Sequence, residues 1–206
     1  MAKKNTRNTR GKIVSAAWQL FYEQGYENTT VEEIIELSQT SKGSFYHYFD
    51  GKDALLSTLS DLFDEKYDAL SETMDPGMDA MEQLLFLNGE LFGMIENSVS
   101  MELLARLLST QLVTSGEKHL LDHSRTYYRL VRRIIAGGQE AGTLTRERSV
   151  NEMVKLYALC ERALMYDWCL CGGEYSLRGY AAETLPHFLS GFLPGSSFKN
   201  RTAGKG

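Results

Sequence analysis

A short segment at residues 41–49 places hydrogen-bonding and cationic side chains on one side of a predicted helix. Phe45 and Phe49 stand four positions apart, and residues with this spacing share a helix face, which we expect to point inward. The outward side then carries Lys42, Ser44, Tyr46 and His47. Small, hydroxyl and cationic groups at the start of a helix suit the edges of nucleic-acid bases, and tyrosine and histidine further along suit phosphate oxygens.

The same segment could instead be an aromatic core cluster built from Tyr46, His47 and Tyr48. Helical phase opposes this alternative, because three consecutive residues cannot all face one core. Gly43 fits the first interpretation, since a residue without a side chain lets the backbone approach a partner closely. The pattern therefore favours a surface that contacts nucleic acid.

Three predicted helices position this segment. The first spans about 9–24 and is stopped by Gly25. A Thr cap three residues before Glu33 forms a capping box and starts a second helix over about 31–37. Ser41 caps the third helix, which runs to about Phe49. Two short helices joined by a tight turn and packed on a supporting helix form a helix-turn-helix, whose second short helix enters the DNA major groove.

Residues 10–56 closely resemble the DNA-binding signature of the TetR family of bacterial transcription regulators. The resemblance lies in GYENTTVEEI at 25–34, TSKGSFYHYF at 40–49 and KDALL at 52–56, with order and spacing intact. The turn departs from the family, which usually has Ala-Gly-Val where this chain has Ser-Gln-Thr at 38–40. Gln39 must then adopt a conformation that glycine takes at a cost lower by about 1 kcal/mol.

The resemblance implies a role for each matching position. Lys42, Gly43, Ser44 and Tyr46 would face bases, and His47, Tyr48 and Lys52 would hold phosphate. The start of the second helix near Thr30 would also hold phosphate through outward backbone N–H groups. The implied DNA-binding residues are Thr30, Ser41, Lys42, Gly43, Ser44, Tyr46, His47, Tyr48 and Lys52.

Charge is distributed unevenly along the chain. The net charge is −5, yet five of the 22 Lys and Arg residues fall within positions 1–12, and no acid accompanies them. A basic arm on an acidic body can lie on phosphate while the body stays clear of it. An ordinary solvated tail explains the same charges equally well. We predict a flexible basic arm at 1–9.

The fold class predicted for the whole chain is all-α. Leu, Met, Ala and Glu outnumber Val, apolar residues recur at helical spacing, and strand-like alternation does not persist. About nine helices are expected: after the first three, a long fourth helix starts at Lys52, and others follow at 78–96, 99–113, 117–141, 149–171 and 176–192. The domains are then the arm at 1–9, a DNA-binding domain at 10–55, a helical ligand-binding and dimerisation domain at 56–194, and a disordered tail at 195–206.

The C-terminal part resembles the family less, although GQEAGTL at 138–144 is similar to the end of its seventh helix. The family implies dimerisation through the last two helices. Residues 156–171 have two roughly opposite apolar stripes, which indicates burial on two sides. A monomer with a thick core is the alternative. The predicted interface residues are Tyr166, Leu170, Ala182, Leu185 and Leu189.

An effector pocket is expected between helices of this domain, and its occupant is expected to be hydrophobic. Its candidate lining is Met81, Leu85, Phe92, Met101, Leu104, Tyr127, Tyr128, Glu161 and Met165. Any methionine-rich core has the same composition. Glu161 stands out, because its helical phase places a carboxylate among Tyr157, Leu164 and Trp168. It could meet a cationic ligand, but an arginine partner or simple exposure is the favoured reading.

Metal, cofactor and catalytic signals are weak. His119 and His123, four apart, could supply two metal ligands from one helix face, but no third ligand is specified, so we predict no metal. The three cysteines form no disulfide framework and fit a reducing cytoplasm. The sequence contains no phosphate loop, nucleophile elbow or paired-carboxylate motif, no membrane span and no secretory signal. We expect no cofactor and no enzymatic activity.

These observations predict a homodimeric transcription regulator, most plausibly a repressor, that binds a palindromic DNA operator and is released by a small-molecule effector. Two alternatives differ in class. One is a helical enzyme with an added DNA-binding head, which would need an acid–base site that the sequence does not offer. The other is a ligand-independent DNA-binding protein, which would show no effector-dependent release.

Overall fold

The computed structural model describes residues 3–113 and 118–195, and every regular element in these ranges is helical. Its α-helices are α1 (Lys3–Gln24), α2 (Val31–Ser38), α3 (Lys42–Tyr48), α4 (Lys52–Leu56), α5 (Thr58–Thr73), α6 (Ala80–Ser98), α7 (Met101–Val113), α8 (Thr126–Ala141), α9 (Val150–Leu170) and α10 (Leu177–Leu189). Two short 3₁₀ turns, η1 (His119–Leu121) and η2 (Ser190–Phe192), complete them. The all-α prediction is confirmed.

The chain divides into two compact units. The first, which we call the head unit, comprises residues 1–63 and 99–121, and the second, the bundle unit, comprises residues 64–98 and 122–206. The prediction placed everything from residue 56 to 194 in one ligand-binding domain. By its contacts α7 instead belongs with the head, because it packs on α4.

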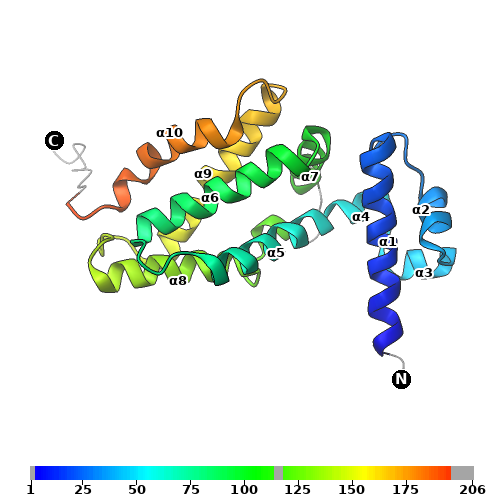
Figure 1. The fold of residues 1–206 in the computed structure, drawn as a ribbon, viewed down its shortest axis with the longest axis horizontal. Coiled ribbons are helices and arrows are strands. Elements are labelled where there is room, and N and C mark those ends of the chain that lie inside the picture. Colours follow the sequence, from blue (N-terminus) through cyan, green and yellow to red (C-terminus); the bar gives the residue numbers. More distant parts are fainter. Residues whose placement is uncertain (1–2, 114–117, 196–206) are drawn as a thin grey trace, which may run out of the picture. The chain divides into compact units, whose positions relative to one another are not determined.

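In the head unit, α1 packs against α2 and α3 (Figure 1). The core between these helices is formed by the fully buried side chains of Ile13, Ala17, Ile34 and Phe45. The inward stripe of the first predicted helix and the inward phase of Phe45 are thus confirmed. Gly25, at φ +84°, follows α1 in the left-handed region that glycine adopts without strain.

The first helix is longer than predicted. It begins at Lys3, so residues 3–9 are helical rather than the flexible arm that was expected over 1–9. This segment contains neither proline nor glycine, and nothing in it stops a helix that has already formed behind it. Residues 1–2 and the side chains of residues 3–8 lie outside the described residues. The predicted contact between the basic arm and phosphate therefore stays a prediction.

The predicted long helix from Lys52 is divided at Ser57 into α4 and α5. Two hydroxyls compete for main-chain carbonyls at this point: Ser57 Oγ donates to Ala54 O at 2.7 Å and Thr58 Oγ1 to Leu55 O at 2.6 Å. Side-chain donors of this kind offer the backbone an alternative to helical hydrogen bonds. The apolar spacing alone could not reveal the break, because Leu55, Leu56 and Leu59 are buried on either side of it.

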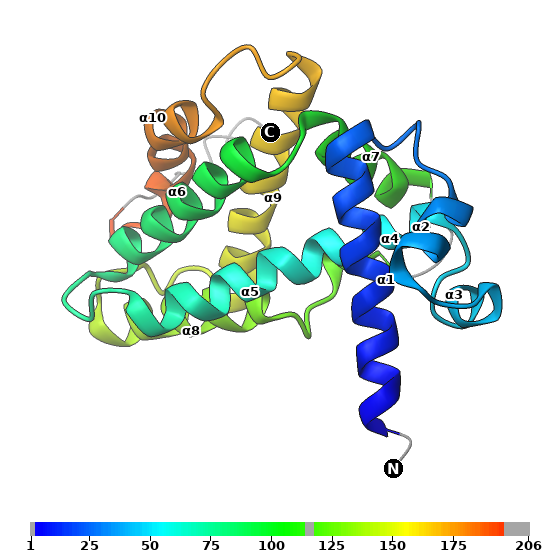
Figure 2. The same cartoon turned by 45° about the vertical axis from the view of Figure 1, so that its right-hand side comes forward.

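In the bundle unit, α6 lies beside α10 and α8, and α9 packs on both α8 and α10 (Figures 1 and 2). Its core is aliphatic and aromatic, with Leu84, Phe92, Val131 and Tyr157 completely buried. The helix predicted over 117–141 is shorter, since η1 and a turn precede α8. Asp122 Oδ1 accepts the Ser124 N–H at 2.8 Å and stabilises that turn.

The remaining boundaries fall within a few residues of those predicted. Gly142 ends α8 at φ +78°, and Ser149 with Glu152 forms a capping box at the start of α9. The predicted disordered tail falls almost entirely on residues 196–206, which lie outside the described residues. No described helix is long and apolar enough to cross a membrane.

Candidate nucleic-acid interface and interior polar site

The start of α2 is fixed by the predicted capping box. Thr30 Oγ1 accepts the Glu33 N–H at 3.2 Å, and Glu33 Oε2 accepts the Thr30 N–H at 2.7 Å. The hydrogen bonds that the Thr30 N–H and hydroxyl donate to the Glu33 carboxylate lower its pKa. The resemblance implied that backbone N–H groups near Thr30 would be free for phosphate. The N–H groups of Thr30 and Glu33 are satisfied within the protein, and the phosphate role of the other N–H groups at this helix start stays a prediction.

The turn between α2 and α3 has the strained residue that the sequence predicted. Gln39 has φ +52°, and among the described residues no other non-glycine residue has a positive φ. Thr40 N–H donates to Ile35 O at 3.2 Å, and the Ser38 and Thr40 hydroxyls lie 2.8 Å apart. The turn is therefore closed by hydrogen bonds even though glycine is absent.

Helix α3 presents its predicted outward residues to solvent. Ser41 caps the helix by accepting the Ser44 N–H at 3.0 Å. The exposed residues beyond it are Lys42, Gly43, Tyr46 and His47, whereas Ser44 and Tyr48 are half-buried. Lys42 Nζ lies 3.8 Å from Glu32 Oε1, a contact between two exposed groups that stabilises little and leaves the ammonium accessible.

Lys52, for which the resemblance implied a phosphate contact, is held by main-chain carbonyls in the structure. Its ammonium donates to Tyr26 O at 2.6 Å and to Thr29 O at 2.9 Å, and it lies 4.2 Å from the centre of the Tyr26 ring. The nitrogen thereby ties α4 to the loop between α1 and α2. Lys52 is thus committed to main-chain carbonyls, and we assign it to positioning the loop rather than to phosphate.

A second cation reaches the same tyrosine from α7. The Arg106 guanidinium lies 4.8 Å from the Tyr26 ring centre and forms an ion pair with Glu27. The Tyr26 hydroxyl donates to Asp53, and burial together with this bond raises the pKa of the tyrosine. We call Tyr26, Glu27, Lys52, Asp53 and Arg106 the tyrosine hub. This hub joins α7 and α4 to the loop that leads into α2, a connection that no local sequence motif signals.

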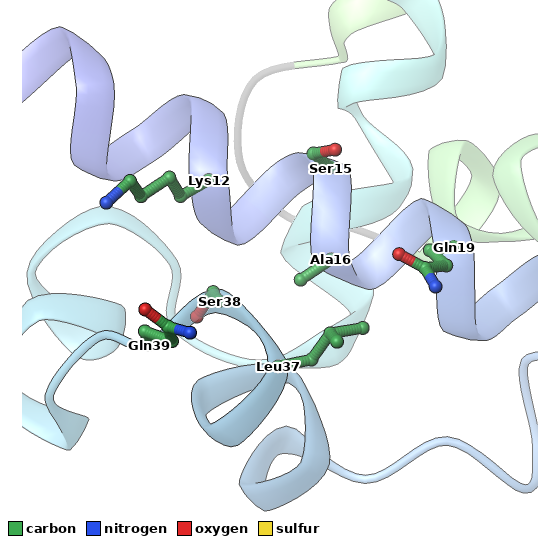
Figure 3. Close-up of a pocket in the computed structure, with 7 residues that line it drawn as sticks. All are labelled: Lys12, Ser15, Ala16, Gln19, Leu37, Ser38 and Gln39. Atoms are coloured by element: carbon green, nitrogen blue, oxygen red, sulfur yellow. The ribbon is translucent and has the colours of Figure 1, made fainter.

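A shallow groove of about 270 Å³ lies in the head unit between α1 and the end of α2. Figure 3 shows Lys12, Ala16 and Gln19 along α1 and Leu37, Ser38 and Gln39 at the end of α2. The lining is mostly polar, and none of the residues predicted to line the effector pocket belongs to it. The groove therefore does not match the predicted hydrophobic effector site.

Glu161 lies deep in the bundle unit, and only 3% of its surface is exposed. Its Oε1 accepts the Asn88 amide at 3.0 Å, and its Oε2 accepts the Tyr127 hydroxyl at 2.6 Å. Both favoured readings of this residue, exposure and an arginine partner, are wrong: within residues 3–113 and 118–195 no ion pair includes it. Burial raises the pKa of its carboxyl against the opposing effect of these hydrogen bonds.

The other predicted pocket residues are divided between the two units. Phe92, Tyr127, Tyr128 and Met165 are buried in the bundle unit, where Met81 and Leu85 are half-buried. Met101 and Leu104 belong to α7, which the contacts group with the head unit. The bundle-unit members thus share a core with Glu161, and the two α7 residues are not placed in that core.

The predicted interface residues also separate. Tyr166 and Leu170 are 48% and 68% exposed, and Ala182 is exposed as well. Leu185 and Leu189 are fully buried inside their own unit, so their inclusion was wrong. Leu159 and Phe188, which are 54% and 57% exposed, were not among the predicted interface residues. The sequence did place Leu159 on one helical stripe with Tyr166 and Leu170, and Phe188 on the apolar face of the last helix.

The histidine pair is not on one helix. His119 begins η1, and His123 lies in the turn before α8, where its ring stacks on Tyr128 at 4.4 Å. The two residues also fall in different units. Within the described ranges, no group of three potential metal-ligating side chains forms. Cys160, Cys169 and Cys171 are free thiols.

The head unit therefore has a capped helix, a tight turn and a second capped helix with an exposed polar face, which is the arrangement of a helix-turn-helix. Residues 13–59 match the family described as bacterial regulatory proteins, tetR family. The chain is similar to this family over these residues.

Relatives of known sequence support the same assignment. An uncharacterised HTH-type transcriptional regulator of Lactococcus lactis is 48% identical over 48 residues, which are 23% of this chain and 24% of that protein. The chain thus aligns with only about a quarter of that relative's length. The regulator HbdR of Aromatoleum is 26% identical over 94% of this chain and 83% of its own.

The fold extends the likeness beyond the head. The structure of Thermus thermophilus FadR, a TetR-family repressor in complex with lauroyl-CoA, superposes with a TM-score of 0.68. It is 23% identical and covers 96% of this chain and all of its own. At this identity the superposition shows a shared fold.

Proposed function

We propose that this protein is a ligand-responsive transcription regulator that represses genes by binding a palindromic operator as a homodimer. A small-molecule effector bound in the bundle unit releases it from DNA. The observation that carries the DNA-binding part is the outward set on α3. Lys42, Gly43 and Tyr46 are exposed on one face of α3, and Phe45 on the opposite face is completely buried.

In this proposal the first residues of α3 read base edges. Lys42 and Tyr46 offer a cation and a hydroxyl, Ser44 offers a second hydroxyl, and Gly43 keeps the backbone close. His47 and Tyr48 hold phosphate oxygens and fix the register of the helix in the groove. Ser41 and Thr30 act as helix caps, so they position these groups rather than read sequence.

The dimer is proposed to form on the exposed apolar stripe of α9, with α10 beside it. Leu159, Tyr166 and Leu170 follow one another at helical spacing and are 54%, 48% and 68% exposed. Phe188 on α10 adds a fourth large apolar side chain that is 57% exposed. A stripe of this size favours association with a second copy, and a two-fold dimer matches the symmetry of a palindromic site.

Release by an effector is proposed as a population shift between operator-fitting and non-fitting spacings of the two recognition helices. The chain runs from one unit into the other at three places: in α5, which spans the division at residue 63, in the segment that joins α6 to α7, and between η1 and α8 at residues 121–122. A change in the bundle unit reaches the head through these segments. The three free thiols fit a reducing cytoplasm, where we place the protein.

The decisive experiment is selection of bound duplexes from a random DNA pool with the full-length protein. We expect enrichment of an inverted repeat whose half-sites lie about one helical turn apart, 10–10.5 base pairs. Titration of the enriched duplex against a scrambled one should give a specificity of at least about 1,000-fold. Equal binding to both duplexes would contradict the proposal.

The dimer is tested by sedimentation of the wild type and of Leu159→Glu with Leu170→Glu. The wild type should sediment as a dimer at micromolar concentration, and the double variant as a folded monomer. Leu112→Glu is the matched control, because Leu112 is 69% exposed on α7 in the head unit. A wild-type monomer would refute both the dimer and the paired-helix mechanism.

A further inference from the structure

The core of the bundle unit contains a carboxylate, Glu161, that forms no ion pair within the described residues, although the charge of Arg162 opposes the rise in its pKa that burial causes. Glu161 accepts hydrogen bonds from Asn88 and Tyr127, both neutral groups. The neighbouring Arg162 directs Nη1 toward the Tyr128 hydroxyl at 3.4 Å, and Arg125 forms its ion pair with Asp64 at 2.9 Å. A buried carboxylate that lacks a counter-cation is costly, because the interior screens and solvates charge poorly.

A second unsatisfied group lies in the same core. Tyr67, on α5, is 1% exposed, and within the described part of the chain its hydroxyl forms no hydrogen bond. Its ring packs against Tyr127 with the centres 5.1 Å apart, so it adjoins the residue that donates to Glu161. Burial, and after it the negative charge of Glu161, raises the pKa of the Tyr67 hydroxyl. Unpartnered buried hydroxyls are rare in folded proteins and point to a missing partner.

We propose that Tyr67, Tyr127, Tyr157, Asn88 and Glu161 form the head-group site of the effector, and that the effector is an organic cation with a protonated amine. This inference rests on the proposed function and deepens it by naming the chemical class of the ligand. The five residues come from α5, α6, α8 and α9, so the site lies where these helices of the bundle unit converge.

An ammonium group meets both deficits together. It has several N–H donors and no acceptor, so one N–H can be donated to the Glu161 carboxylate and another to the oxygen of the Tyr67 hydroxyl. Its charge supplies the counter-ion that Glu161 lacks. The rings of Tyr67, Tyr127 and Tyr157 add cation–π attraction, and the Tyr127 and Tyr157 rings lie nearly parallel, with centres 6.5 Å apart.

Other head groups fit less well. A carboxylate or phosphate would be repelled by the charge of Glu161, and an alcohol would leave that charge uncompensated. The carbon skeleton of the ligand can pack against the apolar side chains on the same helices. Leu84, Leu87 and Phe92 on α6 and Met165 on α9 supply this surface.

The position of Tyr67 also gives the site a route to the DNA-binding head. Helix α5 begins at Thr58 in the head unit and continues to Thr73 in the bundle unit. A ligand that engages the Tyr67 hydroxyl therefore acts directly on the helix that enters the head. Of the cluster residues, Tyr67 alone lies on this helix.

Four probes test the chemical class with the intact full-length protein. Phenylbutylamine, phenylbutanol and phenylbutyrate share one carbon skeleton and differ in head-group charge, and lauroyl-CoA represents the ligand of a structural neighbour. Calorimetry and thermal-shift measurements at neutral pH should show saturable binding of phenylbutylamine. The alcohol and the carboxylate should bind at least about tenfold more weakly, because each lacks the charge that Glu161 requires.

Two variants test the residues. Glu161→Gln should weaken phenylbutylamine binding by about tenfold or more, and Tyr67→Phe by about three- to tenfold, since it removes one neutral acceptor. Glu183→Gln and Tyr22→Phe make the same chemical changes at exposed positions and should bind as the wild type does. Tyr67→Phe removes only an unpaired hydroxyl, so it should remain folded even if Glu161→Gln does not.

The inference is overturned if phenylbutylamine fails to bind, if phenylbutanol, phenylbutyrate or lauroyl-CoA binds as tightly, or if Tyr67→Phe retains full affinity. Binding of the selected operator is measured separately without any probe. Operator binding with no amine response refutes the cation site and leaves DNA recognition standing. An amine response without specific DNA binding refutes the regulator and leaves the site standing.

Discussion

The head unit and the bundle unit differ in how their clustered polar groups are paired. In the tyrosine hub, Lys52 has two close main-chain acceptors, Arg106 has Glu27, and the Tyr26 hydroxyl has Asp53. Within the described part of the bundle unit, Glu161 forms no ion pair and the Tyr67 hydroxyl has no hydrogen-bond partner. The polar groups of the tyrosine hub thus have partners within the protein, whereas two polar groups in the bundle core have partners still to gain.

This difference matches what each unit is proposed to do. A surface that reads DNA benefits from a rigid scaffold, since groups held in place lose little entropy on binding. A unit that responds to a ligand needs an interior whose stability changes when the ligand arrives. Unsatisfied polar groups supply that change, because the ligand removes the cost of leaving them unpaired.

The largest effect should come from removing a hydrogen-bond donor from the tyrosine hub. Lys52→Met leaves the carbonyls of Tyr26 and Thr29 without their donor and removes the cation from the Tyr26 ring. We expect a loss of about 2–3 kcal/mol in the free energy of unfolding, together with weaker operator binding. Urea unfolding monitored by circular dichroism measures this loss.

Lys66→Met is the matched control in the bundle unit. Lys66 Nζ forms a partly exposed ion pair with Glu90 Oε2 at 3.1 Å, so its removal should cost less than about 1 kcal/mol. Equal losses for the two lysines would show that the hub is no more than an ordinary surface arrangement.

The next effect concerns the exposed face of α3, where we expect the Lys42 side chain to contribute to DNA binding and not to the stability of the head unit. Lys42→Ala should weaken operator binding by about tenfold or more, since a good base contact contributes 1–3 kcal/mol, and leave the melting temperature unchanged. Arg133→Ala removes one charge from an exposed position on α8 and should leave affinity unaltered. Loss of helicity in parallel with affinity would make Lys42 structural.

The open bundle core predicts a gain rather than a loss. Glu161→Gln removes the buried charge and keeps the shape, so the ligand-free variant should be more stable than the wild type at neutral pH. A gain of about 1 kcal/mol corresponds to a rise of roughly 2–4 °C in melting temperature for a chain of this size.

The pH dependence of this gain follows from the raised pKa of the Glu161 carboxyl. In the wild type the folded state holds this proton more tightly than the unfolded state, so stability from this group is highest below the ordinary glutamate pKa of about 4.3. It is lost as the pH rises through the raised value. The advantage of the variant should therefore grow from acidic to neutral pH, and a pH-independent difference would contradict the assignment.

Local patterns predicted the head far better than the bundle. The capping box at Thr30, the Ser41 cap and the inward phase of Phe45 depend on residues close in sequence, and all three are confirmed. Helical phase placed Glu161 among apolar neighbours correctly. The partners Asn88 and Tyr127, and the orphaned Tyr67, come from other helices, and no spacing within α9 could indicate them.

Errors in the sequence analysis have the same origin. The motif gave no sign of the contacts of Lys52, because the carbonyls that hold it lie more than twenty positions away in the loop before α2. Leu185 and Leu189 share a helix with exposed residues, and only the packing of α10 on α6 and α9 distinguishes the two faces. Packing between helices distant in sequence thus determined whether these apolar residues are buried or exposed, which their apolar character alone could not indicate.

The smallest expected effect tests whether the head has any strain of its own. Gln39 holds φ +52° in the turn, where glycine avoids the clash of the side chain with the backbone. Glycine also gains freedom in the unfolded chain, which offsets part of this relief. Gln39→Gly should therefore raise the free energy of unfolding by about 0.5 kcal/mol. Gln39→Ala keeps a Cβ in the same conformation and should leave the free energy of unfolding unchanged. Because the turn's main-chain hydrogen bonds are unchanged, operator affinity should match that of the wild type.

Paired urea titrations of the wild type and the two variants measure these differences in the free energy of unfolding. If the glycine variant is the least stable, the strain at Gln39 is negligible and the head is relaxed as well as complete; if it is the most stable, the departure from the family's glycine carries a real cost.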